Sequence, residues 1–269
     1  MMMIKYLLCF LLFTNIFVLL FFNRKKIRKI FYKSKIQSVD PDAVDEYFIP
    51  DVVDEKLKSP NKNMVVETFF VPNSWNVVGM TSDYEGWILS VLSKKSFNIF
   101  EFGTCSGKTT LLFALNSPVN SKIYTITLPP DQAQEKIAET KNKKDNRISI
   151  KNAISESRYD NFMFSNKQEI QNKIKVIFQD STKLSIAKFE NIFDLIFIDG
   201  GHSYSCIKND TEKAMKMIRQ NGLIFWHDYS PGKKSNSDVC KFLNEIRDTY
   251  EIFHIKNTSL CFYKKIGEM

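Results

Sequence analysis

The chain has 269 residues, enough for one α/β domain of about 200 residues and an appendage. Its hydrophobic content of 43% and charged content of 25% are typical of a globular protein. The five cysteines form no CxxC pair and their number is odd, which argues against a disulfide framework or a zinc site and favours a reducing compartment.

The formal net charge of +8 could suggest a nucleic-acid partner, but the excess is local. Seven basic residues crowd into positions 24–35, directly after an apolar stretch, and a membrane surface explains this placement better than nucleic acid does. They are Arg24, Lys25, Lys26, Arg28, Lys29, Lys33 and Lys35. No nucleic-acid partner is therefore expected.

Residues 4–22 are apolar except for Lys5, Thr14 and Asn15, and about 19 residues nearly span a hydrocarbon core. No small-x-small cleavage site follows, which argues against a cleaved signal peptide. We expect residues 1–23 to be a transmembrane anchor. The basic flank then predicts a single-pass membrane protein whose catalytic domain lies on the cytoplasmic side.

We expect residues 24–75 to be a basic juxtamembrane segment and a tether. Within them, the acidic and polar stretch 37–63 is interrupted by Pro41, Pro50 and Pro60 and has no lasting apolar period. The folded domain is expected at 76–269. Near its start, Ser82-Asp-Tyr-Glu85 has the spacing of a capping box and predicts a helix over the apolar residues that follow.

The segment from Asn98 to Leu115 predicts a strand, a glycine turn and a helix, which is how α/β folds approach a cofactor. Its glycines, Gly103 and Gly107, enclose three residues, whereas a phosphate-binding Walker A loop needs four before Gly-Lys-Ser/Thr. Cys105 stands where the dinucleotide fingerprint needs glycine. After these two exclusions, the motif to be explained is Glu-x-Gly-Thr-x-x-Gly-x-Thr-Thr, from Glu101 to Thr110.

Two further strands end in polar residues. The strand expected at 122–128 has Thr127 near its end, and the strand expected at 173–178 is followed by Asp180-Ser181. Asp180 and Ser181 could contact a ligand, or they could only cap the next turn.

The run from Phe193 to Ser230 is the second strong signal. A buried strand at 194–198 ends in Asp199-Gly-Gly-His202, and a helix at 204–219 leads to a strand at 223–226 that ends in His227-Asp228. Carboxylates thus follow two neighbouring strands, beside the crevice where α/β folds bind ligands.

Together these motifs resemble the class I S-adenosylmethionine (SAM) dependent methyltransferases, in particular the group with macrocin-type sugar O-methyltransferases and cephalosporin-hydroxylase-like proteins. The residues that carry the resemblance are the glycine-turn motif and the IDGxHxY…HDY pattern over roughly residues 80–265. It implies an α/β fold with a Rossmann-like, doubly wound, seven-stranded sheet.

The resemblance also implies a set of SAM-binding residues. They are Glu101, Gly103, Thr104, Gly107 and Thr109 at the turn, Thr127 after the second strand, Asp180 and Ser181 after the third, and Asp199 after the fourth. Thr127 departs from the family pattern, which has an aspartate there that can accept both ribose hydroxyls.

Catalysis is expected at Asp199, His202 and Asp228, with His202 as the candidate general base. The resemblance places Mg²⁺ ligands at Asp199, His227 and Asp228, and a metal-free mechanism stays open beside it. The predicted function is O-methylation of a sugar or another polyhydroxylated small molecule or glycan. The alternatives are a cephalosporin-hydroxylase-like enzyme and a degenerate SAM fold kept as an interaction module.

Overall fold

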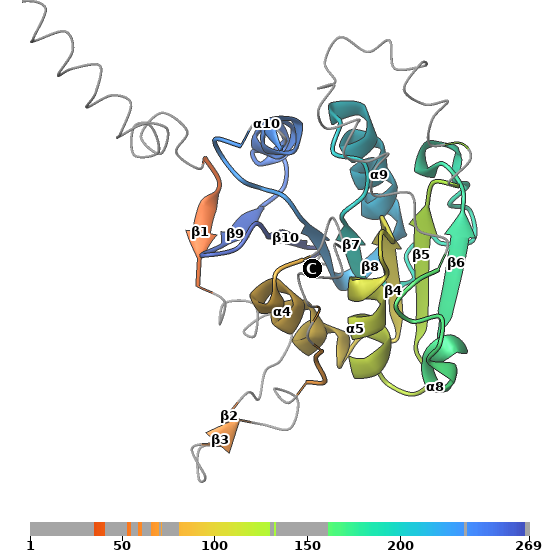
Figure 1. Cartoon of the computed structure of the whole chain (residues 1–269). Helices are drawn as coiled ribbons and strands as arrows, with labels where there is room; N and C mark the ends of the chain where they lie inside the picture. The colour runs from red at the N-terminus through yellow and green to blue at the C-terminus, as the bar shows by residue number, and fades with distance from the viewer. Residues whose placement is uncertain are drawn as a thin grey trace, which may run out of the picture.

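The computed structural model describes residues 35–40, 53–54, 59–60, 66–69, 71, 81–129, 132, 161–233 and 236–266. One eight-stranded sheet runs through the domain in the order β1-β9-β10-β8-β7-β4-β5-β6 (Figure 1). Its strands are β1 (Gln37–Val39), β4 (Asn98–Phe102), β5 (Lys122–Thr127), β6 (Ile174–Phe178), β7 (Phe193–Ile198), β8 (Ile218–Trp226), β9 (Phe253–Ile255) and β10 (Cys261–Lys264). A separate pair, β2 (Val53–Asp54) and β3 (Ser59–Pro60), is antiparallel.

The central strands β6, β5, β4, β7 and β8 are parallel, and β10 runs antiparallel between β8 and β9. The chain builds outward from β4 through β5 to β6, and then crosses to the other side of β4 for β7 and β8. Strand order therefore reverses between β4 and β7. In open α/β sheets the ligand crevice lies outside the carboxyl ends of the strands at such a reversal.

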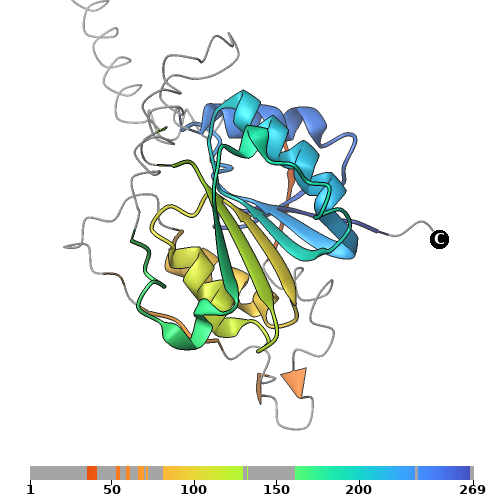
Figure 2. The ribbon, with the colours of Figure 1, turned by 90° about the vertical axis from the view of Figure 1, so that its right-hand side faces the viewer.

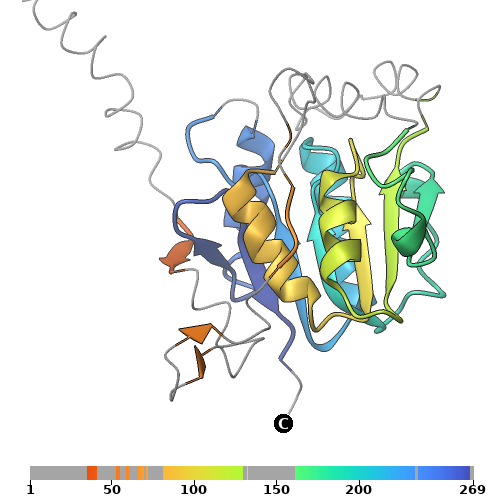
Figure 3. The same ribbon diagram turned by 60° about the horizontal axis from the view of Figure 1, so that its bottom comes forward.

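Helices cover both faces of the sheet. Helices α4 (Asp83–Ser93) and α5 (Lys108–Asn116) lie side by side on one face (Figure 3). Helices α9 (Tyr204–Met217) and α10 (Ser237–Ile246) cover the other face (Figure 2). Two short elements, α8 (Gln168–Gln171) and the 3-10 helix η3 (Ser181–Lys183), flank β6.

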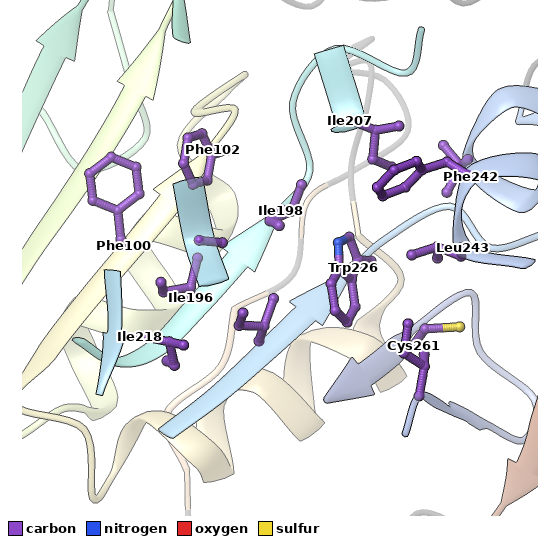
Figure 4. Close-up of a cluster of buried hydrophobic side chains, with 14 of the residues drawn as sticks. Phe100, Phe102, Ile196, Ile198, Ile207, Ile218, Trp226, Phe242, Leu243 and Cys261 are labelled. Atoms are coloured by element: carbon purple, nitrogen blue, oxygen red, sulfur yellow. The ribbon is translucent and has the colours of Figure 1, made fainter. Parts of the chain in front are cut away.

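Successive residues of a strand belong to the cores on opposite faces of the sheet, because successive side chains point to opposite faces. In β4, Phe100 and Phe102 join the cluster under α9 and α10, whereas Ile99 joins the cluster under α4 and α5. Trp226 is fully buried at the centre of the first cluster, between β7 and α10 (Figure 4). Both faces of the central strands are thus buried, which fixes their register and the position of their ends.

The doubly wound, Rossmann-like sheet is confirmed, with one addition. Five strands, β4 to β8, match those expected, and β9 and β10 bring the sheet to the seven strands that the resemblance implies. Strand β1 adds an eighth from within the predicted tether. The capping box of α4 is also confirmed, since the Ser82 side chain and the Glu85 side chain bond reciprocally. The helix expected at 204–219 ends earlier, at Met217, because the backbone from Ile218 already pairs with β7.

The predicted membrane association requires correction. Residues 4–22 lie outside the described residues, and within the described ranges no helix is long and apolar enough to cross a membrane. The longest described helix, α9, has 14 residues, whereas spanning a bilayer takes about 20. This finding contradicts the predicted localisation, a single-pass membrane protein with a cytoplasmic catalytic domain, and it removes the support for a membrane partner.

Candidate active site

Backbone hydrogen bonds connect the carboxyl ends of four neighbouring strands, β5, β4, β7 and β8. The Gly103 N–H donates to Ile126 O at 2.9 Å, and the Asp199 N–H donates to Phe102 O at 2.8 Å. One strand further, the His227 N–H donates to Ile198 O at 3.1 Å. The glycine turn and the polar residues after β7 and β8 are therefore brought together at one edge of the sheet, where the strand order reverses.

The glycine turn packs directly against the end of β7. Gly103 has φ +100°, and a Cβ built there would lie 2.1 Å from the backbone oxygen of Asp199. Only glycine can occupy such a position, because a side chain would be strained at this φ and would overlap the neighbouring backbone. Cys105 also adopts a left-handed conformation, with φ 46°. Gly103 and Cys105 are half-buried, so this part of the turn can be reached from outside.

The second glycine of the turn is covered by aromatic rings. Gly107 has φ +81°, and a Cβ there would lie 2.7 Å from the Phe164 ring. Phe162 and Phe164 are buried and stack on each other with ring centres 5.1 Å apart. Helix α5 begins at this glycine without a capping hydrogen bond from a side chain. The predicted SAM-binding position Gly107 therefore lies beneath the segment that precedes α8.

Glu101 lies beneath the turn in the interior. It is 1% exposed, and its Oε2 accepts hydrogen bonds from the hydroxyls of Thr110 and Thr125. Thr104 bonds to Thr125 at 2.7 Å and so joins this network to the turn. Burial raises the pKa of Glu101 to about 8, although the two threonine hydrogen bonds oppose the shift. In this structure Glu101 and Thr104 connect β4, β5 and α5.

A buried lysine joins the starts of α4 and α5. Lys108 Nζ donates to Thr81 O at 3.0 Å and to Asp83 Oδ1 at 2.9 Å. Thr109, another predicted SAM-binding residue, is buried and bonds to the Thr81 hydroxyl at 2.9 Å. Thr109 thus holds α4 against α5 in this structure.

The remaining predicted cofactor residues follow β5 and β6. Thr127 is buried at the end of β5 and pairs with Phe178 in β6. Asp180 caps η3, where its side chain accepts from the Thr182 N–H at 2.9 Å, and Ser181 is half-buried. The capping role that the sequence allowed for Asp180 is therefore present.

Two carboxylates and two imidazoles form a cluster at the ends of β7 and β8. Asp228 Oδ2 lies 2.9 Å from His202 Nε2 and 3.5 Å from His227 Nδ1. Asp199 Oδ1 lies 3.0 Å from His227 Nδ1 and 3.9 Å from His202 Nε2. The side chains are 11–19% exposed, so the cluster is largely withdrawn from water. We call these four residues the carboxylate–imidazole cluster.

Glu85 holds the far side of His227. Its Oε2 lies 3.3 Å from His227 Nε2 and also accepts from the Ser82 backbone at 3.0 Å. Its Oε1 accepts from the Ser259 backbone at 2.6 Å and from the Ser259 hydroxyl at 2.8 Å. The capping glutamate of α4 is only 5% exposed, and it ties the helix, the end of β8 and the β9–β10 turn together.

Asp228 is held in a conformation that residues with side chains seldom adopt. Its φ is 65°, in the left-handed region, and such strain persists only where the surroundings impose it. The Asp228 N–H donates to the Ser259 hydroxyl at 3.3 Å, and Asn236 donates to Asp228 Oδ1 at 2.6 Å. These contacts aim the other oxygen, Oδ2, at the two histidines.

The charges of the cluster are strongly coupled. Burial raises the pKa of Asp199, and the adjacent histidines partly offset this effect. Burial opposes the charge of Asp228, but His202 and His227 outweigh it and hold the pKa of Asp228 well below its usual range. For His227, burial opposes the charge as well, but Asp199, Asp228 and Glu85 outweigh it and raise its pKa well above its ordinary value.

A metal ion is compatible with the cluster, but its donors do not suit Mg²⁺. Atoms of Asp199, His202 and Asp228 lie within 4.8 Å of one another, close enough to share an ion. Mg²⁺ prefers oxygen ligands and keeps several waters, whereas half of the cluster's donors are imidazole nitrogens.

Sequence reasoning missed the residues that support the cluster. Glu85 was recognised only as a cap, and Asn236 and Ser259 carry no motif. Phe162 and Phe164 follow a polar stretch with no period that would place them over the turn. Apart from the contact between Asn236 and Asp228, which are 8 positions apart, these contacts join segments distant in the chain, which a local pattern does not reveal.

Comparisons with known proteins agree with this geometry. A family model for methyltransferase domains matches residues 100–229, from the middle of β4 to just past the cluster. Over these residues the chain is therefore similar to methyltransferase domains. No curated protein matches the chain.

Solved structures of methyltransferases and related proteins have a similar fold. The SAH-bound methyltransferase PaMTH1 from Podospora anserina is 15% identical, with a TM-score of 0.50 over 74% of this chain and 83% of that one. A Corynebacterium glutamicum protein is 11% identical, with a TM-score of 0.50 over 73% of this chain and 87% of that one. At such identities the likeness extends to the fold alone.

Proposed function

We propose that the methyltransferase domain binds SAM and transfers its methyl group to a hydroxyl of a sugar or another polyhydroxylated small molecule. The observation that carries the proposal is the position of the carboxylate–imidazole cluster. Asp199 contributes both the backbone that touches the glycine turn and a carboxylate of the cluster. A cofactor bound at the turn and an acceptor bound at the cluster would therefore both lie next to Asp199.

SAM binding is supported by the reachable part of the turn. Gly103 and Cys105 are half-buried and left-handed, so the backbone of this part of the turn can be approached closely by a ligand. The family match covers this turn, and the Podospora anserina methyltransferase with the same fold was crystallised with SAH.

Transfer to a hydroxyl needs an aligned acceptor and a group that removes its proton. The carboxylate oxygens of Asp199 and Asp228 can accept hydrogen bonds from neighbouring hydroxyls of one acceptor. A polyhydroxylated molecule suits them because it presents such hydroxyls side by side. Asp199, Asp228 and Glu85 favour the charged form of His227, so this imidazole supplies positive charge beside the acceptor. His202, 2.9 Å from Asp228, is the candidate base that takes the proton of the acceptor hydroxyl.

The proposal is tested with labelled SAM and a panel of sugars, glycosides and catechols, with label transfer as the readout. Asp199→Asn and Asp228→Asn preserve shape and remove one charge each. We expect each variant to lose about 10²-fold or more in turnover, and the double variant to lose little more, because the two carboxylates act as a unit.

Asp248→Asn serves as the control because Asp248 is an exposed carboxylate outside the cluster, with a side chain 83% exposed. SAM affinity is measured for each variant by calorimetry. A wild-type protein that binds no SAM would overturn the proposal. Asp228→Asn with full turnover would remove the cluster from the mechanism and leave the cofactor assignment standing.

A further inference from the structure

Ser259, in the turn between β9 and β10, is hydrogen-bonded to two separate parts of the site. Its backbone N–H and its hydroxyl both donate to Glu85 Oε1, at 2.6 and 2.8 Å. The same hydroxyl oxygen accepts from the Asp228 N–H at 3.3 Å, and Ser259 O accepts from the Tyr229 N–H at 2.9 Å. A hydroxyl has one proton to donate and two lone pairs, so one side chain makes both contacts. Ser259 therefore connects the start of α4 with the residues after β8.

The contact with Asp228 falls on a strained part of the backbone. Asp228 has φ 65°, and such a conformation persists only where the surroundings impose it. The N–H groups of Asp228 and Tyr229 both end on Ser259, so the serine holds this backbone in place. Asp228 Oδ2 lies 2.9 Å from His202 Nε2, and a shift of the backbone would move this oxygen away from the imidazole.

The contacts with Glu85 act on the second imidazole. Ser259 binds Oε1 of this buried glutamate, whereas Oε2 lies 3.3 Å from His227 Nε2. With Oε1 fixed by two hydrogen bonds, the carboxylate cannot turn without breaking them, so Oε2 stays directed at His227. Ser259 thus acts on His202 through Asp228 and on His227 through Glu85.

The turn that carries Ser259 is held by contacts outside the cluster. The Thr258 hydroxyl donates to Ile255 O at 2.8 Å and accepts from the Leu260 N–H at 3.0 Å. Thr258 O accepts from His254 Nε2 at 2.9 Å. Ile255 and Leu260 are fully buried, so the turn is anchored in the core. A site residue is positioned well when the element that supports it is itself fixed in this way.

We propose that Ser259 is a positioning residue for the proposed methyl transfer, because its hydroxyl directs Asp228 towards His202 and Glu85 towards His227. The inference rests on the proposed function for the use of this alignment. Transfer needs an aligned acceptor and base, and a misplacement of about 1 Å can cost about 10²-fold in rate. SAM affinity should depend little on Ser259, since the predicted cofactor turn follows β4.

The first test needs no acceptor. The chain has three histidines, so the nitrogen NMR resonances of their rings are readily assigned in the full-length protein. We expect Ser259→Ala to shift the ring resonances of His202 and His227 at constant pH, because the carboxylates beside them move. The His254 resonances should stay in place. Ser259→Thr keeps the hydroxyl and should give the wild-type resonances for all three rings.

The second test measures turnover with labelled SAM and the acceptor of the panel that takes up most label. Ser259→Ala should lower kcat about tenfold or more, with SAM affinity by calorimetry within about twofold of wild type, and Ser259→Thr should restore kcat. In an Asp228→Asn background, Ser259→Ala should lower turnover by less than about twofold, because it acts through a carboxylate already lost. A residue that only stabilises the fold would lower turnover by the same factor in both backgrounds.

Thr258→Ala is the matched control. It removes the hydroxyl that braces the same turn but none of the contacts of Ser259 with Glu85 and Asp228. The ring resonances of His202 and His227 should therefore stay in place.

Unchanged ring resonances in Ser259→Ala, or equal shifts in Thr258→Ala, would overturn the inference. An equal loss of turnover in both backgrounds would overturn it as well. Shifted resonances in a protein that methylates no acceptor would remove the proposed function and leave the positioning of the two imidazoles standing.

Discussion

At the scale of single residues, two positions at the end of β4 determine the shape of the site. Gly103 lets the turn lie against the backbone of Asp199, and Glu101 anchors the same turn from below through Thr110 and Thr125. Neither residue needs to touch a ligand for its replacement to disturb the site.

Gly103→Ala should destabilise the protein by about 2–4 kcal/mol, because the new Cβ meets a backbone oxygen at a left-handed position. Urea unfolding measures this. The control is Gly86→Ala in α4, whose Cβ meets only the Leu112 side chain at 3.1 Å, and we expect a change within about 1 kcal/mol. Equal stability of the two variants would mean that the turn does not pack on β7 as described.

Glu101 should make stability depend on pH. Its pKa of about 8 in the folded protein lies above the ordinary value of 4.5, because of its burial, so the folded state binds the proton more tightly. The stabilisation is present below the unfolded pKa and is lost as pH rises towards 8. The free energy of unfolding should fall with a slope of at most about 1.4 kcal/mol per pH unit.

The measurement compares urea unfolding of wild type and Glu101→Gln between pH 5.5 and 8. Gln cannot ionise, so the difference between the two proteins isolates this group. Glu190→Gln controls for removal of one charge from an exposed position. Parallel pH profiles for wild type and Glu101→Gln would show that Glu101 does not titrate in this range.

At the scale of elements, β1 is the feature that the sequence pattern did not suggest. It pairs parallel to β9 at the edge of the sheet, and Ser38 bonds to His254 Nδ1 at 3.0 Å. Ile36, just before the strand, is 4% exposed and belongs to the core under α9 and α10. A segment expected to be a tether therefore contributes to the packed domain.

Ile36→Ala should cost about 2–4 kcal/mol, because it removes buried methyl groups and leaves a cavity. Gln37→Ala, at the adjacent exposed position, should change stability by less than about 0.5 kcal/mol. Thermal and urea unfolding of both variants measure the difference. Stability equal to wild type in Ile36→Ala would mean that β1 does not dock in solution.

At the scale of the whole molecule, cofactor binding should be visible as stability. SAM at 100 times its dissociation constant should stabilise the folded chain by about 2.7 kcal/mol, provided that the unfolded chain does not bind it. For a chain of this size the melting temperature should rise by about 5–10 °C. Differential scanning fluorimetry measures the shift, with ATP as the control nucleotide. No shift at any SAM concentration would favour the degenerate interaction module.

Much of the fold could be predicted because its signals are local. Apolar runs followed by a glycine turn or by polar residues located β4, β5, β6, β7 and β8, and the helices between them followed from caps and apolar spacing. Parallel strands end at one edge of a sheet, so Asp199 and Asp228 could be placed together from their positions in the chain alone.

Only the tertiary structure decided which side chains contact one another at that edge of the sheet. It brought Glu85 to His227 across 142 positions and Ser259 to Glu85 across 174, and it laid Phe164 over Gly107. It also showed that β1 completes the sheet. These contacts depend on which surfaces meet when helices pack on the sheet. A local sequence pattern does not indicate which distant residues it will contact. The strand pattern determined the fold and the place of the site, whereas packing determined which side chains hold its donors.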